Sequence, residues 1–336
     1  MPGPLWLRDE DVFAHTVPGH PERPERIVGL EAEMDRHDWF GWERMQAPEA
    51  TRAQLEAVHP PEHVDSIAAL SAAGGGAIDM DTSAVAGTYG AALRAAGGAV
   101  AMVDALMAGA SAAFSALRPP GHHAEAARAM GFCFFNSVAV AARHAQTGHG
   151  IERVLIFDWD VHHGNGTNDI FHADADVLFV SIHESPLYPG TGPASDVGSG
   201  SALGKTVNLP VPAGTGDAAY ASLVEHVIAP LARDHAPGLL LVSAGFDAHH
   251  ADPLATCQVT EAGFAAMTAT FKRLSAELGA PLGLVLEGGY SVRALADSVA
   301  ALMPVLGATE PPGGAAPGAD LPVHPLARRA LERLRA

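Results

Sequence analysis

The chain has 336 residues, 48% of them apolar, which is enough to form the core of one large α/β domain or of two smaller ones. Its formal net charge of −18 argues against a nucleic-acid-binding protein, which would need a basic surface. The same charge would attract cationic ligands, although it is equally compatible with a role in solubility alone.

The sequence shows neither a secretion signal nor a disulfide pattern. The two cysteines, Cys133 and Cys257, are far apart and form no CxxC pair, which favours a reducing compartment. The first residues, MPGPLWLRDEDVF, lack the basic and apolar regions of a signal peptide. We see no run of about twenty apolar residues that would predict a transmembrane helix. We therefore expect a soluble cytoplasmic protein with no membrane or nucleic-acid partner.

Continuous apolar runs that end in polar clusters alternate with Ala-rich stretches of helical character. A helix is predicted over 91–109, a strand over 112–117, and a helix over 136–148 with Asn136 as its N-cap. Unbroken apolar strands are typical of a parallel sheet that is covered on both faces. The alternation predicts an α/β fold with a central, mostly parallel sheet flanked by helices. Further strands are predicted over 154–157, 177–180, 239–242 and 282–286, and further helices over 217–235 and 260–279.

Two segments rich in Gly and Pro interrupt this alternation. Residues 187–217 are predicted to form one long functional loop within the domain, and its movement is left open. Residues 307–322 are predicted to be an irregular tail, followed by a short helix over 325–336. Because we find no repeat and no long linker, we expect residues 1–336 to form a single domain.

Polar side chains follow several predicted strands, at the edge of a parallel sheet where ligands bind. In FDWDVHHGNG, Asp158, Asp160 and His162 are spaced two residues apart and are expected to share one face. Asp247 follows another strand. Buried carboxylates need a partner or a metal. Two Asp and one His with an open position are typical of catalytic zinc, although iron(II), cobalt or manganese would also suit this oxygen-rich set.

Other polar groups at these strand ends add further chemistry. Asp158 could instead orient a histidine or bind a second cation through its oxygens. One histidine of the pair His122–His123 could accept a proton from an activated water, and the hydroxyl of Tyr290 could donate to a developing oxyanion. Together these groups describe the hydrolysis of an amide or ester carbonyl.

Eight short motifs, spanning about residues 12 to 291, then carry a family resemblance. They are HPERPERI (20–27), RPPGHHA (118–124), GFCFFNS (131–137), DWDVHHGNGT (158–167), VSIHE (180–184), YPGTG (188–192), SAGFDAHHADPL (243–254) and LEGGY (286–290). The chain resembles the zinc-dependent histone deacetylase family, with its arginase–deacetylase fold. Within that family it is most similar to the class II and bacterial deacetylase-like amidohydrolase branch.

The resemblance implies an enzyme that uses one Zn²⁺ per chain to remove acetyl or related acyl groups from lysine ε-amines. His123 would act as general base and acid, and His122, paired with Asp158, would stabilise the transition state. Tyr290 would polarise the acyl carbonyl. The implied zinc ligands are Asp160, His162 and Asp247, and the implied catalytic residues are His122, His123, Asp158 and Tyr290.

The resemblance also implies a narrow tunnel for the acyl-lysine stem, because aromatic walls bury methylenes without requiring polar partners. Gly131 and Phe132 would line it with Tyr188 opposite, and Leu254 and Gly288 would complete the substrate-binding set. Leu254 stands where polyamine-selective relatives can carry Glu, which favours acyl-lysine over acetylpolyamine.

One or two structural potassium ions are implied in the same way. The first K⁺ site, behind the zinc, would use Asp158, Asp160, His162, Ser181 and Ile182. A second is expected near Phe171, Asp174 and Val177.

Three features refine the resemblance. Asn165 replaces the Asp of class I enzymes and supports class II. His163 is expected to point away from the zinc and to be structural. The pair His249–His250 leaves open a role beside Asp247.

Three alternatives remain at this point. An acetylpolyamine amidohydrolase is compatible with the acidic charge. An arginase-like binuclear manganese enzyme would need an Asp-rich motif that DWDVHHG does not supply, and a non-catalytic acyl-lysine binder would not need Tyr290 and His123. The expected partners are an acyl-lysine peptide or protein, or a small acylated amine, and the sequence leaves a homo-oligomer open.

Overall fold

Eight strands form one sheet in the order β2-β1-β5-β10-β9-β6-β7-β8, and every pairing within it is parallel. This computed structural model describes residues 3–308 and 321–335. The predicted parallel sheet is confirmed. Its strands are β1 (Leu5–Arg8), β2 (Glu43–Gln46), β5 (Ala113–Ser115), β6 (Val154–Asp158), β7 (Val177–Glu184), β8 (Thr206–Val211), β9 (Leu239–Ala244) and β10 (Leu282–Leu286).

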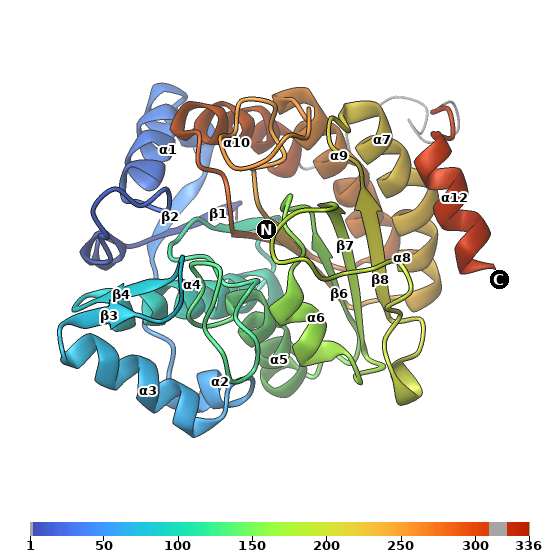
Figure 1. Cartoon of the computed structure of the whole chain (residues 1–336). Helices are drawn as coiled ribbons and strands as arrows, with labels where there is room; N and C mark the ends of the chain where they lie inside the picture. Colours follow the sequence, from blue (N-terminus) through green and yellow to red (C-terminus); the bar gives the residue numbers. More distant parts are fainter. Residues whose placement is uncertain (1–2, 309–320, 336) are drawn as a thin grey trace.

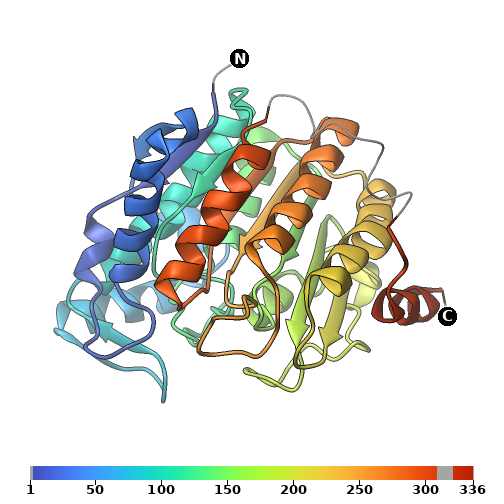
Figure 2. The same ribbon diagram turned by 90° about the horizontal axis from the view of Figure 1, so that it is seen from above.

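Helices cover both faces of this sheet (Figure 1). On one face lie α1 (Glu25–Arg36), α7 (Asp217–Leu223), α8 (Ala229–His235), α9 (Glu261–Leu278) and α10 (Val292–Leu306). Figure 2 shows α1, α10 and α9 side by side on this face. On the other face lie α4 (Thr88–Met107), α5 (Ser137–His149) and α6 (Asn165–Phe171). The remaining elements are α2 (Arg52–Glu56), α3 (Pro61–Ala72), α12 (Pro325–Leu334) and the antiparallel pair of β3 (Gly75–Ala77) and β4 (Ser83–Val85).

The sheet core explains why the sequence shows continuous apolar runs. All residues of β6, β7, β9 and β10 are buried. Side chains that alternate along these strands enter two separate apolar clusters, one on each face of the sheet. Ile156, for example, packs toward α5, whereas Phe157 packs toward α9. Both faces of the central strands therefore need apolar residues.

Several elements differ from the sequence-based expectation. The segment 187–217 is not one loop, because it contains the edge strand β8. Pro210 lies in this strand and is tolerated at the edge, where a backbone N–H can be missing from the ladder. The predicted helix over 217–235 contains a π-helical stretch at Val224–Ile228 between α7 and α8. Residues 309–320 of the expected irregular tail lie outside the described residues.

Helix α4 is long and apolar enough to cross a membrane, although the sequence was expected to contain no such segment. Its length and mean hydropathy of 1.3 would suit a membrane span, yet 67% of that window is buried inside the protein. Ala95, Ala99 and Val103 of α4 belong to the cluster between the sheet and α5. Its apolar composition therefore reflects a core helix.

Candidate functional site

Two carboxylates and one imidazole meet beyond the carboxyl ends of β6 and β9. One ligand atom each from Asp160, His162 and Asp247 lies within 4.8 Å of the others, and all three residues are buried. Nδ1 of His162 is 3.2 Å from Oδ1 of Asp160 and 3.1 Å from Oδ2 of Asp247. The residues that the sequence proposed as metal ligands thus form one cluster.

Backbone N–H groups hold the two carboxylates of this cluster. Val161 donates to Oδ1 of Asp247 over 2.9 Å, and Gly288 donates to Oδ2 of Asp160 over 2.8 Å. A side chain could not fit at Gly288, because its Cβ would lie 2.1 Å from Asp247 Oδ2. Gly288 was expected to contact substrate, but here it lies against the metal-ligand candidates.

The charges in the cluster favour a bound cation. Burial and the neighbouring Asp160 raise the pKa of Asp247 to about 7. The pKa of His162 is lowered by burial, but hydrogen bonds to both carboxylates outweigh this effect and raise it to about 10. Among the described residues, no Lys or Arg forms an ion pair with these carboxylates. A divalent metal would take the place of the proton that the three groups share.

His122 and His123 lie beside this cluster with different partners. Nδ1 of His122 is 3.0 Å from Oδ2 of Asp158, and Nδ1 of His123 is 2.8 Å from Oδ1 of Asn165. Burial opposes the charging of His122, but Asp160 and Asp158 raise its pKa well above the ordinary value. Burial and the adjacent His122 lower the pKa of His123 well below its ordinary value. The pair therefore combines a cationic and a neutral imidazole, which suits electrostatic support and proton acceptance respectively.

A cavity of about 200 Å³ opens at this cluster. Its wall contains aromatic and aliphatic side chains, with the two imidazoles of His123 and His162 and the phenol of Tyr290 at its polar part. Gly131 and Phe132 both have left-handed backbone angles, with φ of 56° and 68°, and the ring of Phe132 packs edge-on against that of Tyr290. The complete lining is Asp81, His123, Gly131, Phe132, His162, Leu187, Tyr188, Leu254 and Tyr290.

Tyr290 is held from two sides. Its backbone N–H donates to Oδ2 of Asp252 over 2.7 Å, and the guanidinium carbon of Arg26 lies 5.0 Å from its ring centroid. Arg26 also donates from Nε to the carbonyl of Gly289 over 2.7 Å. The loop after β10 is thereby fixed to α1, with the phenol at the cavity.

The chain matches a family model and is similar in sequence to several known proteins. The model of the histone deacetylase domain matches residues 20–306. "Histone deacetylase 14, chloroplastic" of Arabidopsis thaliana is 47% identical over 226 residues, which cover 65% of this chain but only 53% of that protein. A "Probable deacetylase" of Archaeoglobus fulgidus is 39% identical, covering 86% of this chain and 81% of the relative. "Polyamine deacetylase HDAC10" of Homo sapiens is 40% identical, covering 87% and 45% respectively.

A solved structure agrees with these sequence matches. The crystal structure of the HDA15 HD domain superposes with a TM-score of 0.89 at 36% identity and covers 99% of this chain and 93% of that one. The chain belongs to the histone deacetylase family. The predicted family, fold and enzyme class are thereby confirmed, since the relatives are named as deacetylases.

The potassium sites expected from the histone deacetylase resemblance stay predictions. Asp158 pairs in register with Ser181 on the adjacent strand β7, and Ile182 follows in the same buried strand. At the second expected site, Arg143 forms an ion pair with Asp174 and lies over the ring of Phe171 at 4.6 Å. This ion pair neutralises the carboxylate of Asp174.

His163 and the pair His249–His250 are placed outside the metal cluster. Nδ1 of His163 is 2.8 Å from Oγ1 of Thr191, and His163 does not belong to the cluster of Asp160, His162 and Asp247. Burial lowers the pKa of His163 to about 3, so it is a neutral ring. The rings of His249 and His250 are tilted against each other with centroids 4.2 Å apart, and Nε2 of His249 lies 3.3 Å from Oε1 of Glu261 rather than beside Asp247.

Sequence reasoning missed two supporting residues. Glu287 is buried, and its Oε2 accepts hydrogen bonds from the backbone N–H groups of Gly121 and His122 over 2.6 and 3.0 Å. Asp81 lines the cavity, although it comes from the loop between β3 and β4. The sequence did contain a signal for Glu287, the acidic residue of LEGGY, because a buried glutamate at a strand end needs hydrogen-bond donors. No pattern in the sequence pointed to Asp81.

Proposed function

We propose that this histone deacetylase family member is a zinc-dependent deacylase that removes acetyl or related acyl groups from lysine ε-amines. The observation that carries the proposal is the composition of the cavity wall. One metal-ligand candidate, His162, lines the same cavity as His123 and Tyr290, so a metal, a base and a donor can reach one carbonyl group.

The residues present fit a zinc ion. Nδ1 of His162 and one oxygen each of Asp160 and Asp247 would bind it, with a position left open for solvent or substrate. When bound, zinc supplies a Lewis acid that polarises a carbonyl and acidifies a water molecule. The buried carboxylates supply negative charge that a divalent cation would neutralise, which supports a metal at this position.

His123 is the proposed general base and acid. Its low pKa keeps the imidazole neutral at neutral pH, so it can accept a proton from water. The contact between its Nδ1 and the Asn165 carbonyl oxygen assigns the ring hydrogen to Nδ1 and leaves Nε2 as the acceptor. His123 would later return that proton to the lysine amine as it leaves.

Tyr290 and His122 are the proposed stabilisers of negative charge. The hydroxyl of Tyr290 would donate to the carbonyl oxygen as it becomes an oxyanion, in a buried site where such a bond is strong. His122, whose pKa is raised by Asp160 and Asp158, would add a positive charge beside the metal-ligand candidates. Asp158 acts through His122 and positions its ring.

The cavity wall supports an aliphatic acyl-lysine stem as substrate. Phe132, Tyr188 and Leu254 offer apolar surface to methylene groups. An acetylated polyamine is the second candidate, favoured by the similarity to a polyamine deacetylase and by Asp81 at the cavity. A cytoplasmic location, a homo-oligomer and potassium binding remain proposals from the sequence.

Zinc removal and return tests the proposal. Dialysis against a chelator should abolish turnover of an acetyl-lysine peptide, and one equivalent of Zn²⁺ should restore it.

A variant and a second substrate test the remaining parts of the proposal. Tyr290→Phe should keep its fold and its zinc, but its kcat should be about 10²–10³-fold lower than that of wild type. Comparing kcat/KM for acetyl-lysine peptide and acetylputrescine separates the two substrates. Full activity in the metal-free protein, or binding without turnover in both wild type and Tyr290→Phe, would refute the deacylase assignment.

A further inference from the structure

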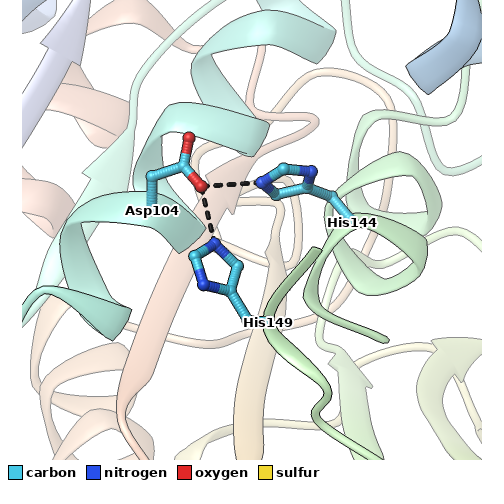
Figure 3. A group of neighbouring side chains, drawn as sticks. All are labelled: Asp104, His144 and His149. Carbon is cyan, nitrogen blue, oxygen red and sulfur yellow. Dashed lines mark hydrogen bonds and ion pairs between the residues drawn. The ribbon is translucent and has the colours of Figure 1, made fainter. Parts of the chain in front are cut away.

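A second group of metal-ligating side chains, Asp104, His144 and His149, lies on the surface (Figure 3). Asp104 is in the last turn of α4, and both histidines belong to α5, which ends at His149. Oδ1 of Asp104 accepts hydrogen bonds from Nε2 of His144 and from Nε2 of His149, each of 2.7 Å. Figure 3 shows both rings pointing at this one oxygen from different directions.

The packing of α4 on α5 holds the three side chains in place. Ala99 and Val103 of α4 and Ala142 and Ala145 of α5 belong to one buried apolar cluster beneath them. The two imidazole rings are 5.3 Å apart between centroids and nearly perpendicular, at 82°. Their side chains are only 18% and 28% exposed. The ligand atoms are thus carried by two packed helices rather than by a loose loop.

This group is at the opposite edge of the sheet from the proposed zinc site. Helix α4 leads into β5, and α5 leads into β6, so both helices end where those strands begin. Asp160 and His123, in contrast, follow the carboxyl ends of these strands. A ligand bound at Asp104 would therefore not touch the substrate of the proposed deacylase.

The electrostatic surroundings favour a cation. The group lies at the carboxyl-terminal ends of two helices, where unpaired carbonyl groups give a partial negative charge. The chain as a whole carries a net charge of −18. Partial burial would raise the pKa of Asp104, but the hydrogen bonds from His144 and His149 lower it, which keeps the carboxylate ionised.

We propose that Asp104, His144 and His149 form a second binding site for a divalent transition metal of the zinc class, which links α4 to α5. Two imidazoles and one carboxylate are a ligand set that zinc accepts, with solvent in the fourth position. The metal would take the Nε2 lone pairs of two neutral rings, so the single ring hydrogen of each histidine would lie on Nδ1 in place of Nε2, with no proton lost overall.

Small side-chain movements satisfy the geometry of this site. Ligand bonds of about 2.1 Å in a tetrahedral site place ligand atoms about 3.4 Å apart. The two N–O separations of 2.7 Å must therefore widen by about 0.7 Å. Asp104 is 54% exposed and can make this adjustment without disturbing the core. The proposal is independent of the deacylase assignment, because neither its residues nor its readout involves catalysis.

The test uses full-length protein whose first zinc site is already filled. Protein loaded with one equivalent of Zn²⁺ and freed of excess metal is titrated with further Zn²⁺ by calorimetry. Wild type should bind one more ion per chain. His149→Ala and His144→Ala should each weaken this second event at least about tenfold, since even residues that only support a metal ligand contribute 10- to 100-fold.

His172→Ala provides a matched control, because Nε2 of His172 also bonds an aspartate, Asp196, at 2.8 Å without a second histidine. This variant should keep the second zinc event. Added zinc should raise Tm in wild type and in His172→Ala but not in His149→Ala. The His149 side chain is 28% exposed, so its removal should leave the fold intact. The Tm of His149→Ala without added metal checks this. Loss of the second event in His172→Ala, or its retention in His149→Ala, would overturn the proposal, as would the absence of any further zinc binding by the loaded wild type.

Discussion

The backbone N–H of Gly288 donates a 2.8 Å hydrogen bond to Oδ2 of Asp160, so the loop after β10 holds a carboxylate that follows β6. A Cβ at Gly288 would lie 2.5 Å from that same oxygen and 2.1 Å from Oδ2 of Asp247. Gly288→Ala should therefore push the two carboxylates apart. We expect zinc affinity to fall by about 10- to 100-fold, measured by competition with a chromophoric chelator.

A second glycine provides the control for this prediction. A Cβ at Gly90, in α4, would meet nothing within 4 Å. Gly90→Ala should keep the zinc affinity of the wild type and raise the stability of the helix slightly, because alanine is the better helix former. If Gly288→Ala bound zinc as tightly as Gly90→Ala, the close contact would not matter to the metal.

Glu287 should stabilise the loop that carries His122 and His123, the two histidines proposed as catalytic. Its Oε2 accepts hydrogen bonds from the N–H groups of Gly121 and His122, and its Oε1 accepts one from Ser243 Oγ. Glu287→Ala would leave these buried donors without a partner. We expect a loss of about 2–5 kcal/mol in the free energy of unfolding, measured in urea with zinc-loaded protein.

The isosteric variant Glu287→Gln separates the contribution of hydrogen bonding to stability from that of the negative charge. Burial raises the pKa of Glu287 to about 7, so a neutral side chain is tolerated there. Glu287→Gln keeps an acceptor oxygen toward Gly121 and His122 and should lose at most about 1 kcal/mol. Equal losses in the two variants would mean that charge, and not hydrogen bonding, stabilises the loop.

The central strands could be predicted from the sequence because they are buried on both faces. Continuous apolar runs such as 154–157 and 239–242 coincide with β6 and β9. The edge strands β2 and β8 and the neighbouring strand β1 escaped prediction, because β1 and β2 have only four residues each and β8 contains a proline. In β2 all four residues are exposed, so there is no apolar pattern to read.

The candidate site was predictable where motifs follow those central strands. Asp160, His162 and Asp247 come together because β6 and β9 are neighbours in the sheet. Spacing alone could not assign Gly288 or Glu287 to their places. Both belong to the loop after β10, and their roles depend on how that loop approaches β6 and β9 in space.

Glu22 should be essential to the fold, because it is a buried anion between two buried cations. Its Oε1 lies 3.1 Å from Nη1 of Arg26 and 2.7 Å from Nε of Arg118. Arg26 in turn packs on the ring of Tyr290. Glu22→Gln would leave the two guanidinium groups without a counter-charge. We expect a loss of about 3–5 kcal/mol in the free energy of unfolding, measured in guanidinium chloride.

A surface pair of similar geometry gives the comparison for Glu22. Glu31 binds Arg8 through two hydrogen bonds of 2.7 and 3.0 Å, but the arginine side chain is 32% exposed. Because solvent screens this pair, Glu31→Gln should cost only about 0–1 kcal/mol. A loss in Glu22→Gln no larger than that in Glu31→Gln would show that the buried network contributes no more than a surface pair.

His59 should make the stability of the protein fall in mild acid. Nε2 of His59 accepts a 2.9 Å hydrogen bond from the backbone N–H of Asn136, so Nδ1–H must donate to the carbonyl of Ala126. Burial lowers the pKa of His59 from 6.5 to about 4 in the folded protein. Protonation would place a second donor against the Asn136 N–H, at the start of α5.

The sign of this effect follows from the two pKa values. Between pH 6.5 and 4 the unfolded chain binds a proton at His59 and the folded protein does not, so stability decreases as pH falls through this window. From pH 7 to pH 5 this one group should cost about 2 kcal/mol.

The variant His59→Gln isolates this contribution. Its side-chain amide can donate and accept but does not titrate, whereas the other buried histidines His15, His163 and His183 are unchanged. The free energy of unfolding, measured in urea at pH 7 and pH 5, should fall by about 2 kcal/mol less in the variant than in wild type. Equal losses in the two proteins would mean that His59 keeps the same affinity for protons in the folded and unfolded chains, and the hydrogen bond from Asn136 would then not hold the ring neutral.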